Sequence, residues 1–180
     1  DIIYNSNYSK KIHIKNGFTK RNSTVITNGF DTNKYLFKDS LRGKFLNKFN
    51  LNNDVFLISM YARFHPIKNH KIFFKAIDQL IIKHPNIHIF LAGRYINWKN
   101  KKLKKLIYDF NLKNKITLGG LLNEEEILGS YSATNITILT SLSESFPNVI
   151  GESMACSTPC ISFNVGDCSD IIGSSGWIIK

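Results

Sequence analysis

Two glutamates, Glu144 and Glu152, stand eight positions apart in the segment ESFPNVIGESM. Between them, Phe146, Pro147 and Asn148 form a loop pattern that leads into an apolar helix, and Pro147 suits the first turn of that helix. Glu144 then lies on the loop, whereas Glu152 lies ~1.5 turns inside the helix, roughly 7 Å along its axis. Taken alone, they would be a solvated loop residue and a helix-surface residue; together they can contact two different parts of one ligand.

Two basic residues, Arg63 and Lys68, follow an apolar run in the segment ARFHPIKNH. Alone they would be ordinary surface cations. At the end of a buried strand, facing a helix that starts near Pro147, they supply fixed positive charges, while the helix adds N–H donors and its positive end. This combination suits a diphosphate. The chain has neither a GxxxxGK[ST] loop nor a GxGxxG loop, so neither a phosphate-cleaving P-loop nor a standard dinucleotide site is indicated.

The elements that must position these residues alternate between strand and helix patterns. Apolar, β-branched runs predict buried strands at residues 54–62, 87–93, 115–120, 135–140, 158–163 and 176–179. Helical spacing predicts helices near residues 69–84, 99–111, 123–132 and 147–156. Asn69 is expected to cap the first of them. The alternation predicts a doubly wound parallel α/β sheet, which binds ligands at the carboxyl ends of its strands. Besides Arg63 and Lys68, the residues expected at that edge are Gly93, Arg94, Gly119, Gly120 and 141–147.

The composition suits one globular domain with part of a neighbour attached, because 43% of the 180 residues are hydrophobic and 21% are charged. The first residue is Asp1 and the chain stops abruptly at Lys180, so we expect it to be part of a longer protein. No apolar run approaches the ~18 residues of a membrane span. The net charge of +11 favours phosphate-rich partners such as nucleic acid, anionic lipid head groups or a nucleotide.

Cysteines and lysines form the remaining distinctive patterns. Cys156, Cys160 and Cys168 are odd in number and include no CxxC pair, which favours small buried or loop thiols in a reducing compartment over a metal site. The densest basic block is WKNKKLKKL at residues 98–106. It predicts a solvated helix face, with a membrane-surface patch as the alternative.

The run ESFPNVIGESMACSTPCI resembles the E-x7-E signature of retaining glycosyltransferases of family 4, whose GT-B fold has two Rossmann-like domains facing each other across a cleft. Further segments resemble that family in the expected order: VITNGFDTNKY, YARFHPIKNH, ITLGGLLNEEEILGSYSATNITILTS and NVGDCSDIIGSSGWII. The resemblance implies that residues 1–53 are the end of an acceptor-binding N-terminal domain with the interdomain linker. It implies that residues 54–180 are the nucleotide-sugar-binding C-terminal domain, truncated at its end.

The same resemblance implies roles for individual residues. Arg63 and Lys68 match the pair that contacts the donor's diphosphate and stabilises the leaving nucleotide, so no metal or other cofactor is expected. Glu144 matches the glutamate that faces the transferred sugar, and it completes the expected catalytic set with Arg63 and Lys68. Glu152 matches the glutamate that accepts hydrogen bonds from the ribose hydroxyls. The other expected substrate-binding residues, near the sugar, phosphate or base, are Leu121, Ser145, Phe146, Asn148 and Val149.

The chain departs from the family pattern at several positions around the two glutamates. Ser153, Ser157 and Cys160 stand where many members have Ala, Gly and Val. Ser157 falls where a glycine usually provides a left-handed turn after the helix, which predicts local strain or a different cap. Ser145 replaces the commoner glycine after the sugar-facing glutamate, and this leaves the identity of the donor sugar open.

The resemblance implies a retaining transferase that moves a hexose or N-acetylhexosamine from a nucleotide-sugar donor. By the same resemblance, the FPNV variant favours a UDP-sugar as the donor. The expected acceptor is a saccharide or a lipid-linked saccharide in bacterial surface polysaccharide synthesis. We also expect a cytoplasmic location, peripheral contact with an anionic membrane, no nucleic-acid partner, and no transfer activity from the isolated fragment.

Two alternatives from other classes stay open. A GT-B sugar-nucleotide epimerase would need histidine and carboxylate acid–base pairs, but no match to such pairs is seen at His65, His70, His84 and His88. A basic nucleic-acid-binding module would need aromatic residues interleaved with Lys and Arg on a sheet face. The lysines of this chain cluster on one helix instead.

Overall fold

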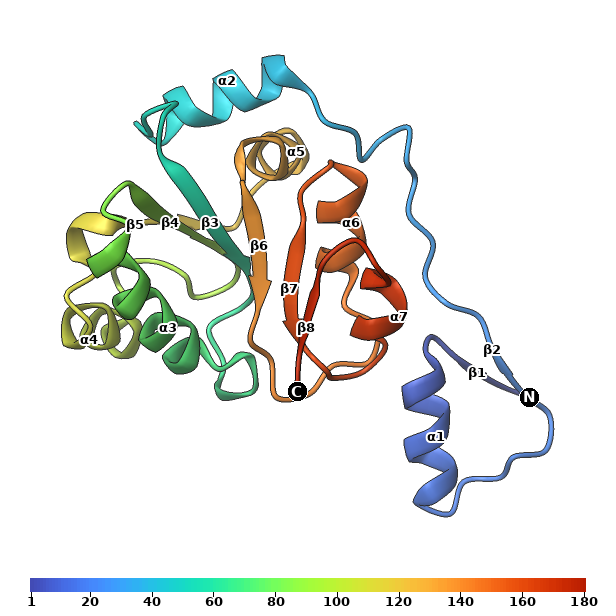
Figure 1. The fold of residues 1–180 in the computed structure, drawn as a ribbon. Coiled ribbons are helices and arrows are strands. Elements are labelled where there is room, and N and C mark those ends of the chain that lie inside the picture. The colour runs from blue at the N-terminus through green and yellow to red at the C-terminus, as the bar shows by residue number, and fades with distance from the viewer.

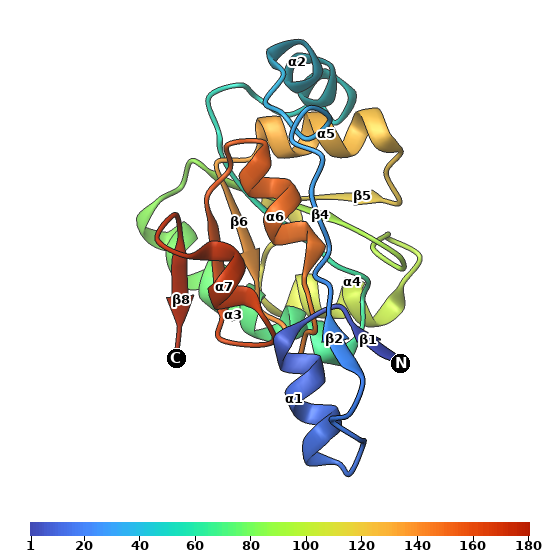
Figure 2. The same ribbon diagram turned by 90° about the vertical axis from the view of Figure 1, so that its right-hand side faces the viewer.

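The computed structural model describes residues 1–180 and contains a six-stranded parallel sheet, helices on both of its faces, and a small unit at the amino terminus (Figures 1 and 2). The strands of the large sheet are β3 (Phe56–Tyr61), β4 (Ile87–Ala92), β5 (Ile116–Gly120), β6 (Ile136–Leu139), β7 (Cys160–Phe163) and β8 (Trp177–Ile179). The helices around it are α2 (Asp39–Lys48), α3 (His70–Lys83), α4 (Lys101–Asp109), α5 (Glu124–Ala133), α6 (Asn148–Ala155) and α7 (Cys168–Ile172). Two 3-10 turns complete the elements, η1 (Pro66–Lys68) and η2 (Lys113–Lys115).

The strand order is β5-β4-β3-β6-β7-β8, and every neighbouring pair is parallel. The chain enters the sheet at its centre in β3, moves outward to β5, returns through α5 to β6, and then moves outward again to β8. The direction of winding therefore reverses between β3 and β6. This confirms the doubly wound sheet, and ligands of such sheets bind outside the carboxyl ends of the strands at that reversal.

The amino-terminal unit, residues 1–25, consists of β1 (Ile2–Tyr4), α1 (Asn7–Lys15) and β2 (Ser23–Val25), with β1 and β2 parallel. It lies beside the large sheet, below α7 in Figure 1. From β2 the chain runs as an extended linker past α6 before α2 begins (Figure 2). The linker thus crosses the outside of the helix that carries Glu152.

The core explains why the central strands have nearly continuous apolar sequences. Side chains alternate along β3 and β4, so Ile58 and Ile89 pack under α3 and α4, whereas Leu57 and Phe90 pack under α2 and α5. All four of these residues are buried. The largest cluster lies on the α3 side, where α3 adds two phenylalanines and an isoleucine and α4 adds a leucine and an isoleucine.

Several expectations differ from the structure. Asn69 does not cap α3 through its side chain; it adopts a left-handed conformation at φ 51°. The side chain of His65 instead accepts from Ile67 N and caps η1 before α3 begins. Helices α2 and α7 were not expected, and Gly119 and Gly120 end β5 rather than follow it. The apolar content of α2 is low, and α7 has only 5 residues, so neither gives a clear helical pattern.

Candidate functional site

Two loops meet at the carboxyl edge of the sheet beside the reversal point. The ammonium group of Lys68 forms an ion pair with Glu144, and these side chains are only 20% and 12% exposed. Leu142 N donates to Ile67 O at 2.8 Å, and the Thr140 hydroxyl donates to Lys68 O at 3.1 Å. The structure therefore joins the loop after β3 to the loop of residues 141–147, here called the Glu144 loop. Two of the residues selected from the sequence are in direct contact.

Arg63 lies at the same edge, directly after β3, and its side chain is exposed. The 5 ion pairs of the chain all use lysines, so no carboxylate neutralises the Arg63 guanidinium. Gly93, at the end of β4, has φ +141°, and a Cβ atom there would collide with Ala62 O and Arg63 N. The glycine thus allows the two strand ends to approach closely. Arg63 is available for an anion.

The start of α6 faces this edge without a cap. Pro147 is the N-cap residue and makes no side-chain capping hydrogen bond, so the first N–H groups of α6 have no acceptor of that kind. Phe146, directly before it, stacks on Phe30 of the linker with ring centroids 6.0 Å apart. The side chain of Asn148 accepts a hydrogen bond from Asn28 at 2.7 Å. Val149 follows on the same helix turn.

The linker residues that support α6 were not identified as site residues from the sequence. The ring of Phe30 fills the space that a side chain at Gly151 would need, so the helix can hold the linker this closely only with glycine there. The segment containing Asn28 and Phe30 did match the family's interdomain pattern. That match was the one available indication of their role.

Glu152 points toward α5 and is held there by a tyrosine. The Tyr131 hydroxyl donates a 2.8 Å hydrogen bond to the Glu152 carboxylate. Burial, together with the nearby Glu152 charge, raises the pKa of Tyr131 well above its usual value, so the hydroxyl keeps its proton. Burial and the same carboxylate also raise the pKa of Tyr35. Tyr131 was missed from the sequence because its role depends on packing between α5 and α6.

Leu121 and Ser145, the remaining selected residues, differ in their surroundings. Leu121 follows Gly120, which has φ +65° at the end of β5, and it is 76% exposed. Its backbone lies at the carboxyl edge, as expected. The Ser145 hydroxyl, in contrast, is bonded to Ser6 and Asn5 of the amino-terminal unit, at 2.8 Å in each case. No pattern in the sequence indicates that contact.

The cysteines and histidines do not form a reactive group. Cys156, Cys160 and Cys168 are buried and unpaired, and burial raises the pKa of Cys160 to about 12. No group of three metal-binding side chains occurs in the structure. His70 is 3% exposed and both of its ring nitrogens lack a hydrogen-bond partner. Burial, with a smaller effect of the charge on Lys68, lowers the pKa of His70 to about 4.

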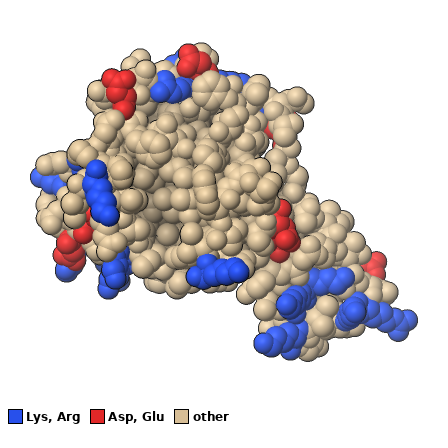
Figure 3. Space-filling view, viewed as in Figure 1, with Lys and Arg blue, Asp and Glu red and all other residues tan.

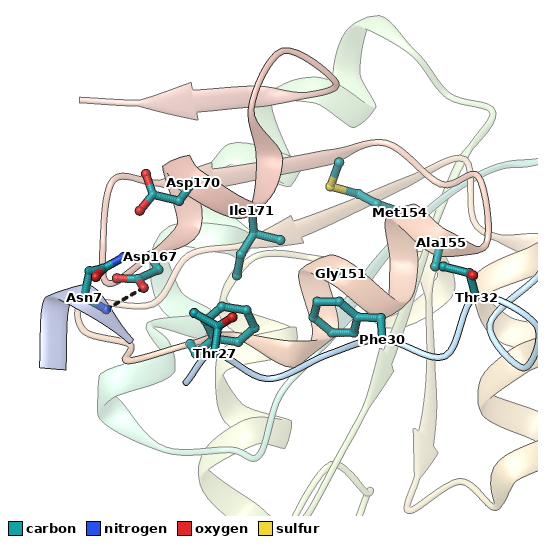
Figure 4. A pocket seen from close by; sticks show the side chains of 11 residues that line it. Asn7, Thr27, Phe30, Thr32, Gly151, Met154, Ala155, Asp167, Asp170 and Ile171 are labelled. Carbon is teal, nitrogen blue, oxygen red and sulfur yellow. Dashed lines mark hydrogen bonds between the residues drawn. The ribbon is translucent and has the colours of Figure 1, made fainter. Parts of the chain in front are cut away.

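A separate cavity of about 550 Å³ lies between the linker and helices α6 and α7 (Figure 4). Phe30, Phe146 and Ile171 form part of its apolar wall, and Asp167 and Asp170 stand at one end. Arg63, Lys68 and Glu144 are not among its lining residues. The cavity therefore adjoins the end of the Glu144 loop at Phe146 and does not include the three charged residues of the edge.

The fold is an α/β domain with a doubly wound parallel sheet, of the kind that binds ligands at the carboxyl ends of its strands. The sequence model of the family described as glycosyl transferases group 1 matches residues 42–180. The chain belongs to this family. The corresponding half of GT-B glycosyltransferases has the same Rossmann-like architecture.

Individual relatives agree with this assignment. The D-inositol 3-phosphate glycosyltransferase of Paenarthrobacter aurescens (strain TC1) is 28% identical over 148 residues, which cover 80% of this chain and 36% of that protein. The crystal structure of Anabaena HepE (Alr3699) in complex with UDP and glucose matches with a TM-score of 0.87 and 26% identity, over 99% of this chain and 48% of that one. A glycosyltransferase from Rickettsia africae has the same fold, with a TM-score of 0.87 and 24% identity, over 100% of this chain and 49% of that one. The chain therefore spans less than half the length of these relatives.

Proposed function

We propose that this chain is the donor-binding half of a retaining glycosyltransferase of family 4. The observation that carries the proposal is the contact between Lys68 and Glu144, because it joins two motifs that are 76 residues apart into one charged site at the reversal point of the sheet. The complexes of HepE with UDP and glucose and with UDP-glucose support a UDP-sugar donor. The transferred group would be a hexose or N-acetylhexosamine.

In this proposal the positive groups bind the diphosphate of the donor. Arg63, Lys68 and the uncapped end of α6 lie where negative charge develops as the nucleoside diphosphate leaves the sugar. Three fixed positive groups of this kind can replace a divalent cation, so we propose that no metal is needed. The absence of a partner for Arg63 is consistent with a site prepared for an anion.

The two glutamates bind the neutral parts of the donor. Glu152 accepts a hydrogen bond from Tyr131 through one oxygen, which leaves its other oxygen for a ribose hydroxyl. Glu144 lies on the loop, beside Lys68, where it can orient the hydroxyl groups of the transferred sugar. When the diphosphate approaches Lys68, the Glu144 carboxylate exchanges its ion pair for hydrogen bonds from the sugar.

We also propose that the acceptor is a saccharide or lipid-linked saccharide, bound by a second domain, and that the enzyme works at the cytoplasmic face of an anionic membrane. Lysines line the exposed side of α4, while Leu103 and Ile107 of the same helix are buried in the core. Trp98 and Tyr108 are exposed among those lysines. The structure has no helix with the length and apolar character needed to cross a membrane.

Calorimetry of the 180-residue chain with UDP, with and without EDTA, tests the donor site. Arg63→Ala should weaken UDP binding by ~1.5 to 3 kcal/mol, because it removes a charge-assisted contact to phosphate, and it should leave uridine binding nearly unchanged. Arg21→Ala removes the same charge from the amino-terminal unit and should not affect UDP. Binding that requires Mg²⁺, or that is equally sensitive to both substitutions, would contradict the proposed site.

A further inference from the structure

A buried carboxylate connects the amino-terminal unit to the part of the molecule that carries the site. Asp167 accepts hydrogen bonds from the backbone N–H groups of Asn7 and Tyr8, both at 2.9 Å, and Figure 4 shows Asp167 facing Asn7. These N–H groups begin α1. The next two N–H groups of α1 are bonded to the hydroxyl and the carbonyl of Ser6. Asp167 thus completes the cap of a helix that lies 160 residues away in the sequence.

The Asp167 carboxylate is compensated by α1 and has no ion-pair partner. Its side chain is 4% exposed, and none of the ion pairs of the chain includes it. The positive end of α1 and the two N–H donors take the place of a cation. A buried carboxylate without such partners is unfavourable, so Asp167 is satisfied only while α1 remains docked.

The same residue lies against the backbone of the Glu144 loop. Asp167 N donates to Ser145 O at 3.0 Å. Its neighbour Gly166 has φ +56°, and a Cβ atom there would lie 2.6 Å from the carbonyl oxygens of Glu144 and Ser145. These segments are therefore in direct backbone contact. A displacement of the Asp167 backbone therefore breaks or strains these contacts to the Glu144 loop.

A second connection runs through side chains. Ser145 donates its hydroxyl proton to Asn5 at 2.8 Å, so in its contact with Ser6 the Ser6 hydroxyl is the donor. Both partners belong to the amino-terminal unit, directly before α1. The docked unit thus holds the residue next to Glu144 from one side while Asp167 holds it from the other.

We infer that Asp167 is a positioning residue, which couples the docking of the amino-terminal unit to the position of the Glu144 carboxylate. The coupling follows from the contacts themselves. Its consequence for sugar transfer rests on the proposed function, because that function assigns Glu144 to the sugar. Such coupling would orient the sugar correctly only while the amino-terminal unit is docked against the part of the chain that carries the Glu144 loop.

Hydrogen exchange of the 180-residue chain tests the coupling without any ligand. Asp167→Asn keeps the size of the side chain but places an amide N–H₂ group against one of the two N–H donors of α1. Amide exchange should increase about tenfold both in residues 7–10 and at the two amides that hydrogen-bond at the Glu144 loop, Leu142 N to Ile67 O and Asp167 N to Ser145 O, because local opening becomes easier in both places. The matched control is Asp170→Asn, which removes the same charge from an exposed residue without a hydrogen bond to α1. It should change neither segment.

The outcome that overturns the inference is faster exchange in residues 7–10 with no change at the Leu142 and Asp167 amides. Asn5→Ala provides a second variant on the other side of the contact if Asp167→Asn lowers stability too far. Asn5 is exposed, and its side chain bonds Ser145. Its removal should increase exchange at the Leu142 and Asp167 amides, and unchanged exchange there would also count against the coupling.

Kinetics of the longer enzyme give the functional readout. Asp167→Asn should lower kcat about tenfold while the donor KM, and the affinity of the 180-residue chain for UDP, change less than twofold. A purely structural role would lower the melting temperature and leave kcat of the folded enzyme unchanged. Failure of the wild-type chain to bind UDP would refute the proposed donor site, whereas the exchange experiment would still decide whether the two segments are coupled.

Discussion

Glu144 and Glu152 have different neighbours, and this difference bears on what each can do. Glu144 is paired with a cation on a loop, where a ligand that brings negative charge to Lys68 changes its surroundings. Glu152 is fixed in a helix by a neutral hydroxyl donor, Tyr131, whose pKa lies well above its usual value. A fixed carboxylate suits a constant part of the donor, such as ribose. A carboxylate that can exchange partners suits the part that reacts.

Glutamine substitutions separate these roles better than alanine, since an amide still accepts from Tyr131 or Lys68. Glu152→Gln should weaken UDP and the matching UDP-sugar equally, by ~1 to 2 kcal/mol, because both carry the ribose hydroxyls. Glu144→Gln should leave UDP affinity nearly unchanged and weaken only the UDP-sugar. In the longer enzyme it should lower transfer more than donor affinity. An equal loss of UDP affinity in the two variants, measured by calorimetry, would show that the roles assigned to the two glutamates are wrong.

The buried imidazole of His70 predicts a pH dependence of stability. Its pKa is lowered to about 4 in the folded chain, so between pH 6.5 and 4 the unfolded state binds a proton that the folded state does not. The free energy of unfolding should therefore fall as the pH decreases through this interval, by about 3 kcal/mol from this residue. Denaturant unfolding of the wild type and His70→Leu at several pH values measures the difference. Above pH 7 the two proteins should have the same pH dependence.

A second histidine also contributes to this pH dependence of stability. Burial also lowers the pKa of His88, so His70→Leu should retain part of the slope. Phe64→Leu is the matched control, because the Phe64 ring packs on His70 with centroids 5.1 Å apart but does not titrate. This variant should be less stable than the wild type at every pH, but its free energy of unfolding should change with pH as that of the wild type does. If the free energy of unfolding of His70→Leu fell with decreasing pH as steeply as that of the wild type, the buried imidazole would not be the cause of the pH dependence.

At the scale of elements, helix α6 ends in a left-handed turn that is formed without a glycine. Thr158 N donates to Ser153 O at 3.0 Å and Ser157 N donates to Met154 O at 2.9 Å, which are the two hydrogen bonds of a Schellman motif. Ser157 adopts the left-handed conformation that this motif requires, with φ 63°. Of the two alternatives expected from the sequence, local strain or a different cap, the structure has the first, because the usual left-handed turn is kept. It is formed by serine, an unfavourable residue for this conformation.

Replacing Ser157 with glycine should therefore stabilise the chain. The side chain of Ser157 is exposed, so little packing is lost, and the relief of the left-handed conformation should add ~0.5 to 1 kcal/mol to the free energy of unfolding. Ser157→Ala is the control, since it removes the hydroxyl but retains the Cβ atom. Thermal or denaturant unfolding in which the glycine variant is no more stable than the alanine variant would contradict this explanation.

How well each element can be predicted from the sequence depends on how that element is buried. Strands buried on both faces, such as β3 and β4, have continuous apolar sequences and were located to within about two residues. Helix α2 was missed because only Phe45 and Leu46 are buried, which is too few to give a helical period; it packs through them against the sheet and α5, and its Lys44 and Lys48 also pair with glutamates of α5. Such pairing depends on tertiary structure. The expected Asn69 cap failed because that residue takes a left-handed conformation between η1 and α3.

For the whole molecule, the sequence located the charged edge but not the contacts that cross between distant segments. Motif order and the doubly wound pattern placed Arg63, Lys68 and Glu144 at one edge before their geometry was known. The roles of Asp167, Tyr131 and the linker could not be predicted, because each depends on a contact with a segment far away in the chain. Such contacts are products of folding and leave no periodic pattern in the sequence.

The distribution of charge over the whole molecule leads to the last prediction, which concerns the membrane. Basic side chains lie along the lower margin of the molecule and on the amino-terminal unit in Figure 3, on the side where the carboxyl edge of the sheet is found in Figure 1. Residues 1–25 contain five lysines and arginines but only one acidic residue. A membrane on this side would bring a lipid-linked acceptor close to the proposed donor site.

The details of α4 indicate how such contact would occur. Its apolar residues are already buried in the core, so the helix cannot insert, and the contact must be electrostatic with aromatic side chains at the head groups. Lys104 and Lys113 both lie over the ring of Tyr108, at 5.9 and 5.6 Å from its centroid. Binding should therefore depend on anionic lipid and fall steeply with salt.

Charge reversal on α4 tests this idea with vesicles of phosphatidylglycerol and phosphatidylcholine. Each lysine near an anionic surface contributes about 1 kcal/mol, so Lys101→Glu with Lys104→Glu should lower vesicle affinity by at least about thirtyfold in co-sedimentation. The matched control, Lys75→Glu with Lys83→Glu, makes the same charge change on exposed positions of α3 and should have a much smaller effect. UDP affinity should survive both double substitutions. Equal loss of vesicle affinity in the two double variants would show that only net charge matters. Tighter binding of the wild type to single-stranded RNA than to anionic vesicles would favour a nucleic-acid partner instead.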